Sequence, residues 1–478
     1  MDRLSADILD KLPRPDEAEL DRLLAAEIAA DDHKIVVLDD DPTGVQTVHD
    51  ISVFTGWDED SVREGFLEEN KLFYILTNSR GMTPEETAAV HREISETVAK
   101  VASELGRRYL FMSRSDSTLR GHYPLEPELL REGMEARGVR VDGEVLTPFF
   151  KEGGRFTIGN VHYVQQGNEL VPAADTEFAK DKSFGYTKSS IPEYIEEKTR
   201  GEYKAEGVTC VSLEELRGLR LDDIEAKLLA VKGFGKVCVN AADYCDIKAF
   251  SIALYRAMRK GKSFMFRTAA GLVKVMGGVS DRPLLSGDEM IGSANGRGGI
   301  VVVGSHMQKT TDQLNELLKL DCAVPVEFDS DKVLEGDEAL DAEVRRCVKL
   351  EEEIMSSGRI AAVYTRRKLL TVKGDTKESA LIRSVKISDA VQRLVGELGE
   401  APSFIIAKGG ITSSDIGKKA LKVRRADVMG QIRPGIPVWR TGAESRFPGI
   451  PYVIFPGNTG SVTDLRTAAE ILQGAAHS

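Results

Sequence analysis

The sequence predicts an α/β protein made of two α/β domains with largely parallel sheets. Short, continuous apolar runs such as 34–38 and 299–305 alternate with amphipathic helical stretches along most of the chain. Runs of this kind are typical of strands buried on both faces of a parallel sheet. The alternation breaks at 279–299, a stretch rich in Gly, Ser and Asp, and then restarts. The length of 478 residues also favours more than one core.

These breaks predict the domain organisation. We expect an N-terminal helical extension over 1–32, a first domain over 33–285, a linker over 286–297 and a second domain over 298–478. The extension packs either on the main body or on a second subunit, so a homodimer remains open. In sheets of this class, ligands bind at the carboxyl ends of the strands, and we expect the active site there, in the interdomain cleft.

The individual elements follow from the same pattern. The expected strands are 34–38, 72–77, 109–113, 144–150, 207–212, 236–240 and 262–268, then 299–305, 322–328, 359–365, 403–410, 436–442 and 451–457. The stretch 83–105 is a strong helix prediction, because Thr83, Pro84 and Glu86 supply an N-cap, a first-turn proline and a capping-box glutamate. The segments 149–163 and 171–186 favour a long β-excursion near the site.

Composition and charge exclude several classes of function. The net charge of −12 disfavours a general nucleic-acid-binding protein. No apolar stretch is long enough for a membrane span, and the acidic start lacks the features of a secretory signal. The five cysteines are scattered and form no CxxC pair, which argues against a disulfide framework and a zinc site. We therefore expect a cytoplasmic protein with no membrane or nucleic-acid partner.

The segment IVVLDDDPTGVQTVHD (35–50) is the most informative. An apolar strand leads directly into Asp39, Asp40 and Asp41 and then into a Pro-Thr-Gly turn. Because side chains alternate along a strand, Asp39 and Asp41 are expected to point one way and Asp40 the other. Adjacent carboxylates repel one another, so they require a cation, a hydrogen-bond donor or a ligand nearby.

Three chemical interpretations of this segment compete. An EF-hand loop nearly matches in spacing, but a β-branched strand stands where the entering helix should be. A phosphatase of the haloacid-dehalogenase type fits better, because its apolar strand ends in Asp-x-Asp-x-Thr, here with Asp39 and Asp41; later lysine and acidic-pair motifs are missing. The third interpretation is a site for a sugar acid, in which carboxylates hold substrate hydroxyls and one removes a proton.

Two further strand ends favour the sugar-acid interpretation. SRSDSTLRGHYP (113–124) places Arg114 and Asp116 in one loop. Arg114 can form two parallel hydrogen bonds with a substrate carboxylate, and Asp116 can accept from a hydroxyl or act as base. TNSRG (77–81) adds Asn78, Ser79 and Arg80.

The second domain carries glycine turns after its strands. Ser305 follows one strand, Lys408, Gly409 and Gly410 lie at the end of a second, and the third runs into Gly457, Asn458 and Gly460. Glycine lets the backbone approach an anion, and helix N-terminal amides attract it. Together these turns predict a nucleotide site. Neither a Walker loop nor a GxGxxG fingerprint is present in the sequence.

With these motifs in view, the chain closely resembles the four-carbon acid sugar kinase family. The matching segments are LDDDPTGVQTVHD (38–50), TNSRG (77–81), SRSDSTLRGHYP (113–124), PFFKEGGRFTIGNVHYV (148–164), TEFAKD (176–181), VVGSHMQKT (302–310), AKGGITSSDI (407–416) and FPGNTG (455–460). Two departures are the N-terminal extension and Val45, where a small or hydroxyl residue is more usual.

The resemblance implies ATP-dependent phosphorylation of acids such as threonate, erythronate or 3-oxo-tetronate. By motif it implies substrate contacts at Asp41, Arg114 and Asp116. It implies nucleotide contacts at Ser305, Thr365, Gly409, Gly410 and Gly457. We expect ATP and Mg²⁺ as cofactors and no certain protein metal ligand. The expected catalytic residues are Asp116 or Asp41 as base and Lys408, for which a structural salt bridge is the alternative. A phosphatase and a non-catalytic sugar-acid sensor remain alternatives.

Overall fold

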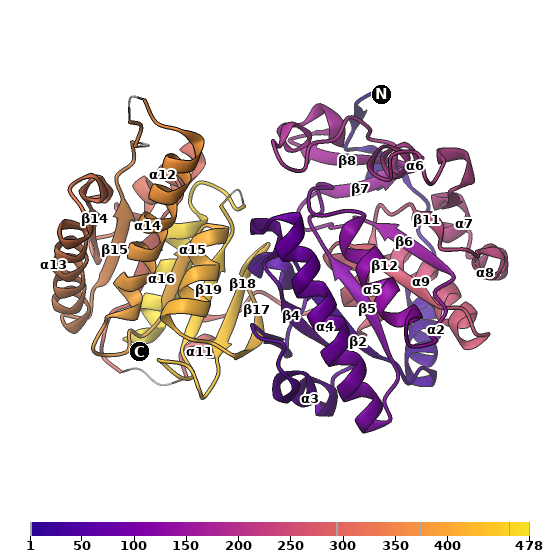
Figure 1. Cartoon of the computed structure of the whole chain (residues 1–478), viewed down its shortest axis with the longest axis horizontal. Coiled ribbons are helices and arrows are strands. Elements are labelled where there is room, and N and C mark those ends of the chain that lie inside the picture. Colours follow the sequence, from indigo (N-terminus) through magenta and orange to yellow (C-terminus); the bar gives the residue numbers. More distant parts are fainter. Residues whose placement is uncertain (1, 293–294, 369, 373, 458, 478) are drawn as a thin grey trace. The chain divides into compact units, whose positions relative to one another are not determined.

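The computed structural model describes residues 2–292, 295–368, 370–372, 374–457 and 459–477. The chain divides into two compact units. Unit 1 consists of Met1–Gly44 and Gly56–Asp281, and unit 2 consists of Val45–Thr55 and Arg282–Ser478. Each unit is an α/β structure in its own right (Figure 1). The short segment Val45–Thr55 therefore belongs to the C-terminal unit although it lies early in the sequence.

Unit 1 is built on a parallel sheet with the strand order β10-β11-β6-β12-β5-β2-β4. Its strands are β2 (Lys34–Asp39), β4 (Leu72–Leu76), β5 (Tyr109–Arg114), β6 (Gly143–Thr147), β10 (Thr209–Val211), β11 (Gly235–Val239) and β12 (Phe264–Thr268). The non-consecutive order means that helices cross over between the strands, as parallel pairing requires.

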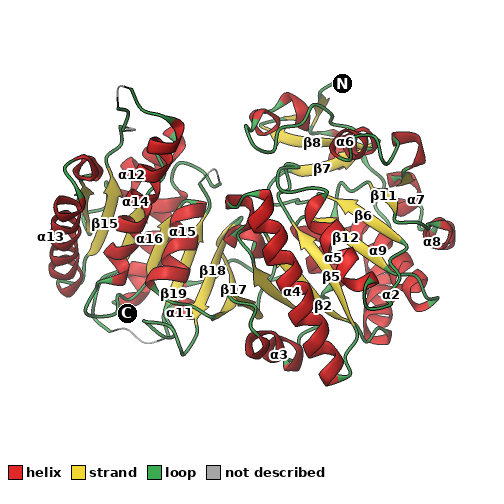
Figure 2. Ribbon diagram, in the orientation of Figure 1, coloured by secondary structure: helices red, strands yellow, loops and turns green. Residues whose placement is uncertain are grey.

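Two layers of helices cover this sheet (Figure 2). One layer contains α3 (Glu59–Leu67), α4 (Pro84–Leu105) and α5 (Leu125–Glu135). The other contains α2 (Glu17–Ala30), α7 (Leu213–Arg217), α8 (Leu221–Ala230), α9 (Tyr244–Arg259) and α10 (Ala270–Met276). Helix α4 has the predicted capping box between Thr83 and Glu86, and the predicted helical extension contains α1 (Ile8–Lys11) and α2.

A second, antiparallel sheet of unit 1 has the order β1-β9-β8-β7. Its strands are β1 (Leu4–Ser5), β7 (Arg155–Ile158), β8 (Val161–Gln166) and β9 (Glu169–Pro172), and it is followed by η3 (Ala173–Asp175), η4 (Glu177–Lys180), α6 (Ile191–Lys198) and η5 (Ala205–Gly207). The β-excursion predicted over 149–163 is present, whereas the predicted stretch 171–186 is extended only to Pro172 and continues as the turns η3 and η4, so that part of the prediction is wrong. A cluster of buried residues, among them Tyr123, Tyr186 and Tyr194, packs under it.

Unit 2 has the strand order β3-β17-β18-β19-β16-β13-β15-β14. The strands from β19 to β14 are parallel, whereas β18, β17 and β3 are added antiparallel. The bounds are β3 (Ile51–Phe54), β13 (Ile300–Val303), β14 (Ala323–Phe328), β15 (Ile360–Thr365), β16 (Ile405–Lys408), β17 (Arg425–Arg433), β18 (Ile436–Thr441) and β19 (Pro451–Phe455).

The helices of unit 2 also form two layers. Helices α13 (Asp337–Ser356), α14 (Lys377–Gly396) and α15 (Gly410–Asp415), with the π-helical turn η7 (Ile416–Ala420), form one. Helices α11 (Gly287–Met290), α12 (Gln308–Leu317) and α16 (Asp464–Ala476) form the other, and η6 (Ser330–Leu334) precedes α13. Leu317, Ile406 and Leu472 are among the residues of the core between the sheet and this second layer.

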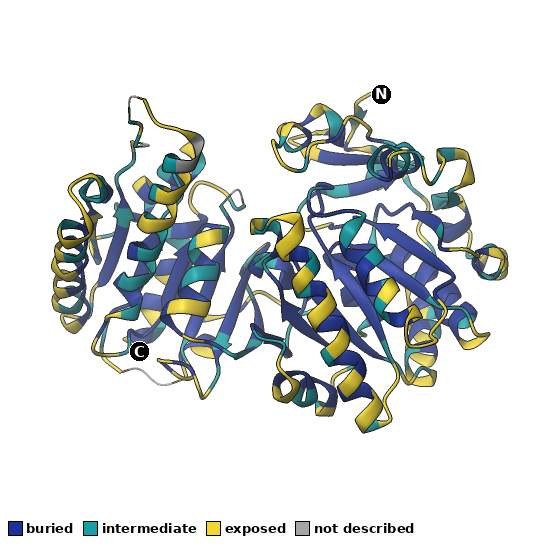
Figure 3. Ribbon diagram, in the orientation of Figure 1, coloured by how far each residue is buried: buried dark blue, intermediate teal, exposed yellow. Residues whose placement is uncertain are grey.

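The burial of the strands explains why the apolar runs could be recognised. Every residue of β2, β4, β13, β16 and β19 is buried (Figure 3). Strands with both faces covered are largely apolar, which is the pattern that the sequence has; the charged residues Lys34, Asp39 and Lys408 stand at strand ends. Each predicted strand is present, and the predicted α/β class with largely parallel sheets is confirmed.

Candidate functional site

The carboxyl ends of three neighbouring strands bring the predicted unit 1 residues together. Strand β2 pairs with both β4 and β5, and in register Asp39 lies opposite Leu76 on one side and Arg114 on the other. The residues that follow these strand ends are therefore neighbours. They include Asp40 and Asp41 after β2, the segment 77–81 after β4, and the loop 115–122 after β5.

Arg80 joins three carboxylates of this cluster. Its Nε and Nη2 atoms lie 3.1 Å and 2.6 Å from the two carboxylate oxygens of Asp40. Its Nη1 atom lies 3.3 Å from Asp41 and 4.0 Å from Asp116. The expectation that Asp41 points away from Asp40 is wrong, because β2 ends at Asp39 and Asp41 already lies in the following turn. One guanidinium thus supplies the cation that the adjacent carboxylates require.

Arg114 and Asp39 form a second, deeper pair. The Arg114 side chain is only 4% exposed, and its Nη1 atom lies 3.2 Å from Asp39 Oδ1. A Cβ atom on Gly44 would fall 1.8 Å from Asp39 Oδ2, so the turn closes directly over this carboxylate. Burial raises the pKa of Asp39 to about 7, although Arg114 opposes the shift. Arg114 therefore serves as an internal counter-ion, and the structure does not place it on an exposed surface.

Asp116 is held ionised by two arginines. Its Oδ2 atom accepts hydrogen bonds from Arg120 Nε at 2.8 Å and from the Thr118 hydroxyl. Burial alone would raise the pKa of Asp116, but Arg80 and Arg120 outweigh it and hold the pKa well below its ordinary value. Arg120 also lies over the Phe178 ring at 5.1 Å. Asp116 is thus a well-positioned hydrogen-bond acceptor but a weak base.

Asn78 and Ser79 occupy different environments although they are adjacent. Asn78 is half-buried and has a left-handed backbone with φ of 57°. Ser79 is buried, and its hydroxyl donates to Glu126 at 2.5 Å while its carbonyl contacts His122 Nε2 at 3.0 Å. Ser79 therefore fixes the position of the segment that carries Arg80.

In unit 2 the strands β15, β13, β16 and β19 are consecutive parallel neighbours, so their following turns meet at one edge. Gly409 has φ of 123°, and a Cβ atom there would lie 3.7 Å from Ser305 Cβ. The Thr310 hydroxyl bridges the turns, because it lies 3.3 Å from the Gly457 carbonyl and 3.4 Å from the Ser305 hydroxyl.

The structure thus brings together Ser305, Gly409 and Gly457 from the predicted nucleotide residues. Thr365 joins them, because its hydroxyl lies 3.5 Å from the Gly304 carbonyl. Gly410 begins α15 directly after Gly409. Asn458 lies outside the described residues. Gly460 has φ of 83° and lies against Asp464, which accepts a hydrogen bond from the Ser461 amide at 2.6 Å.

Lys408 is fully buried beneath the last of these turns. Its Nζ atom donates to the carbonyl oxygens of Pro456 at 2.5 Å and Gly457 at 3.2 Å, and lies 4.2 Å from the Phe455 ring centroid. Desolvation, with a smaller effect of Lys309, lowers the pKa of Lys408 to about 7. Among the described residues its hydrogen-bond partners are carbonyls and not a carboxylate, so it fixes the turn that contains Gly457.

The sequence analysis did not select Arg367, which lies beside the glycine turns of unit 2. It selected Thr365 from the segment Thr365–Arg366–Arg367 but not Arg367. The Nη2 atom of Arg367 donates to the Ser305 carbonyl and to Thr311 at 2.9 Å, whereas its buried Nη1 atom has no hydrogen-bond partner among the described residues. A buried, unsatisfied guanidinium N–H beside glycine turns fits an anionic group such as a phosphate. The double arginine after an apolar strand was the available signal.

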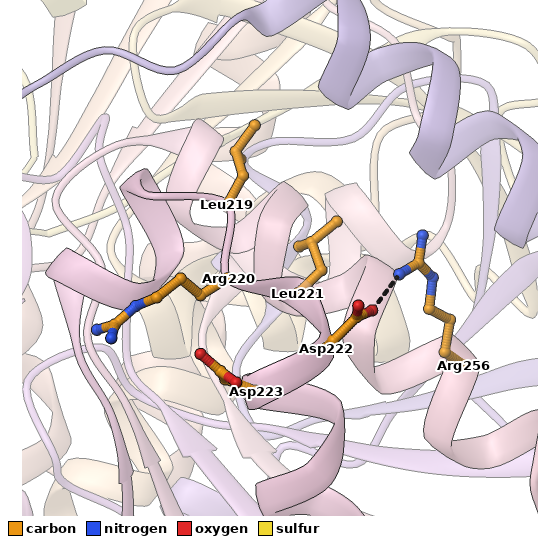
Figure 4. A pocket seen from close by; sticks show the side chains of 6 residues that line it. All are labelled: Leu219, Arg220, Leu221, Asp222, Asp223 and Arg256. Atoms are coloured by element: carbon orange, nitrogen blue, oxygen red, sulfur yellow. Dashed lines mark ion pairs between the residues drawn. The ribbon is translucent and has the colours of Figure 1, made fainter.

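Other candidate sites do not coincide with these residues. A hollow of about 400 Å³ in unit 1 is lined by Leu219, Arg220, Leu221, Asp222, Asp223 and Arg256 (Figure 4). Asp222 and Arg256 form an ion pair across it at 3.5 Å. Among the described residues, the group with metal-ligand spacing is Asp31, Asp32 and His33, and Lys71 and Arg108 already pair with its carboxylates. None of the helices in the described ranges has the length and apolarity of a bilayer span.

Comparisons with known proteins also divide the chain into an N-terminal and a C-terminal part. Residues 35–276 match the model of a sugar-binding N-terminal domain, and residues 300–465 match that of a nucleotide-binding C-terminal domain. Among curated proteins, no significant match was found.

Two solved structures share the fold. One is a Salmonella typhimurium LT2 protein named provisionally as a tRNA synthase, with 16% identity, a TM-score of 0.62, and coverage of 91% of this chain and 98% of its own. The other is the Haemophilus influenzae protein HI1011, with 16% identity, a TM-score of 0.57, and coverage of 91% and 99%.

Proposed function

Because the chain belongs to the four-carbon acid sugar kinase family, which joins a sugar-binding N-terminal domain to a nucleotide-binding C-terminal domain, we propose that it is an ATP-dependent kinase for a small sugar acid. The observation that carries the proposal is the set of residues at the carboxyl ends of the parallel strands in each unit. One edge holds a carboxylate–arginine cluster around Arg80, and the other holds glycine turns beside Arg367, whose buried Nη1 atom has no hydrogen-bond partner among the described residues. The acceptor in the proposal is a hydroxyl of a four-carbon acid.

Phosphoryl transfer depends mainly on positioning the reactants and on neutralising charge, because the protein itself need form no covalent bond in the transition state. In the proposal, Asp116 and Asp41 accept hydrogen bonds from substrate hydroxyls, and Asp116 takes the proton of the attacking hydroxyl. The low pKa of Asp116 makes it a weak base. This suits a loose transition state, in which the proton leaves late.

The glycine turns receive the triphosphate in this proposal. The backbone at Gly409 and Gly457 can approach phosphate oxygens closely, and Arg367 supplies the charge-assisted donor. Lys408 acts by holding the Gly457 turn. Mg²⁺, when bound with ATP, neutralises phosphate charge. The carboxylates nearest these turns in sequence, Asp415 and Asp464, are already paired with Lys419 and Arg433, so we expect the metal to be held mainly by the phosphates.

The phosphatase alternative receives no support from the site. Its nucleophile would be Asp39, whose carboxylate is 2% exposed, paired with Arg114 and covered by Gly44. A nucleophile must reach its substrate, and this carboxylate is enclosed.

The test is an assay of ADP release by the purified protein with Mg-ATP and a panel of acids that contains threonate, erythronate and 3-oxo-tetronate. We expect acid-dependent ADP formation and a phosphorylated acid detectable by mass. Release of inorganic phosphate from phosphorylated acids without ATP would support the phosphatase instead. Binding of acid and nucleotide with no product would support a non-catalytic sensor.

A further inference from the structure

Two of the five cysteines face each other on neighbouring strands of unit 1. Strand β10 pairs in parallel with β11, and Cys210 lies directly opposite Cys238 in the register. Residues opposite each other in a parallel pair point to the same face of the sheet. Cys238 belongs to the buried cluster that contains Tyr186 and Tyr194, and Cys210 packs against that cluster. No local pattern reveals this pairing, because α7 and α8 separate the two strands in the sequence.

The spacing of the two strands suits a disulfide bond. Adjacent strands lie about 4.8 Å apart, and the Cα atoms of bonded cysteines are separated by about 4.4–6.8 Å. The Cβ atoms must approach within about 4.5 Å, so a small shift of one strand is needed. Strand β10 can make this shift, because it is short, stands at the end of the strand order and has β11 as its one partner among the described strands.

The two thiols differ in exposure and in charge environment. Cys238 is buried, whereas Cys210 is part-exposed and can meet a small solute. The Nζ atom of Lys227 lies 2.9 Å from the Cys210 carbonyl oxygen. A hydrogen bond from the Cys238 thiol, together with the Lys227 ammonium, lowers the pKa of Cys210 against the effect of burial. The same hydrogen bond, together with burial, raises the pKa of Cys238. Cys210 is therefore the more readily ionised and more accessible of the two.

The other three cysteines, all in the described ranges, are placed differently. Cys245 and Cys347 are buried in helices, and burial raises the pKa of each to about 12. Cys322 is part-exposed like Cys210, but it stands just before β14, whose partner β15 carries no cysteine. Cys322 is thus an internal comparison for an accessible thiol with no cysteine on the paired strand.

We propose that Cys210 and Cys238 form a peroxide-reactive dithiol site that converts reversibly into an intramolecular disulfide. The Cys210 thiolate attacks one oxygen of hydrogen peroxide, so that an S–O bond forms, the O–O bond breaks and the departing hydroxide takes a proton from solvent. The Cys238 sulfur then attacks the Cys210 sulfur. The S–S bond forms, the S–O bond breaks, and the hydroxide leaves as water with the thiol proton.

This reaction is balanced, because two thiols give up two electrons and one peroxide accepts them to become two water molecules. It is reversible by an ordinary dithiol, since a disulfide that requires a strand to shift is more easily reduced. The site is independent of the proposed kinase function, because it uses neither the acidic cluster nor the glycine turns.

The first experiment treats the reduced full-length protein with hydrogen peroxide, blocks the remaining thiols with N-ethylmaleimide and identifies linked peptides by mass. Trypsin leaves Cys238 and Cys245 in one peptide, so cleavage before Asp243 is added to separate them. The expected product is a peptide pair joined through Cys210 and Cys238, about tenfold or more abundant than any other linked pair. Dithiothreitol should restore all five thiols.

The second experiment asks whether Cys210 is the residue that reacts first. In Cys210→Ser, oxidation of Cys238 should slow by about tenfold or more, because a buried thiol with a raised pKa is a poor nucleophile. Cys322→Ser is the matched control, and it should form the linked pair at the wild-type rate. Circular dichroism checks that both variants fold, and the wild-type peptide map decides alone if Cys210→Ser does not.

Three results would overturn the site. One is the absence of the linked pair at peroxide concentrations that oxidise Cys322. Another is conversion of Cys210 to its sulfinic acid while Cys238 remains a free thiol, which would show that the second sulfur does not reach the first. The third is oxidation of Cys238 in Cys210→Ser at the wild-type rate.

Discussion

The substitution Asp116→Asn removes a charge from the acidic cluster and keeps its shape. In the wild-type protein Asp116 accepts from Thr118 and from Arg120 at 2.8 Å, and Arg80 lies 4.0 Å away. Asparagine can accept with one oxygen only, and its amide nitrogen would face a donor. The attacking hydroxyl would then lose an ionised acceptor, and both arginines would lose a counter-ion.

The size of the effect follows from the pKa of Asp116. General bases contribute about 10²- to 10⁴-fold to rate, with less from weak bases. Because Arg80 and Arg120 hold this pKa well below its ordinary value, we expect kcat to fall by about 10²-fold, at the lower end of that range. Loss of a charge-assisted hydrogen bond should also cost about 1.5–3 kcal/mol of folding stability.

The assay is ADP release at saturating acid, with the Kd for ATP measured separately by calorimetry. The Kd should stay within about twofold, because the nucleotide turns belong to unit 2 and Asp116 to unit 1. Asp181→Asn is the matched control, since Asp181 also faces Arg120 but at 3.8 Å and with 29% exposure, and it should retain most activity. Turnover of Asp116→Asn near the wild-type level would remove Asp116 from the mechanism.

Three further outcomes are expected. Gly457→Val should weaken ATP binding by about tenfold or more, because the added side chain would obstruct a phosphate. The protein should still fold, since a Cβ atom at this position meets no atom within 4 Å. An unchanged Kd for ATP would refute the role of this turn. Arg367→Ala should weaken ATP binding by about tenfold, whereas Arg366→Ala, whose side chain pairs with acids, should not; calorimetry of both variants decides. Glu351→Met should raise the free energy of unfolding by about 1–3 kcal/mol at pH 8, because burial raises the pKa of Glu351 and both its oxygens lack partners. Because the pKa of Glu351 is raised in the folded state, the wild-type protein keeps its full stability below about pH 4 and loses stability as pH rises. The stability gained by Glu351→Met should therefore shrink toward pH 4 in denaturation curves. Glu353→Met, at an exposed position, should show no such trend.

The sequence was a good guide to elements that depend on local pattern. Helix α4 begins where Thr83, Pro84 and Glu86 predict, because capping is decided by residues within one turn. The apolar strands were recognisable because both faces of the parallel sheets are covered. The short strand β3 was not predicted. It pairs with β17 of unit 2, which lies far away in the sequence. Such a pairing leaves no periodic signal within either segment.

By itself the sequence determined the fold class and the family. It also located the acidic strand ends of the first domain and the glycine turns of the second, which point to that family. Only the tertiary structure decided what each charged residue does. Arg80 and Arg114 both come after apolar runs and look alike in sequence. In the structure Arg80 lies part-exposed among three carboxylates, whereas Arg114 is the last residue of β5 and is enclosed beside Asp39. The physical reason is that desolvation and charge pairing depend on neighbours from other strands, and these neighbours are set by the order of strands in the sheet and not by adjacent residues.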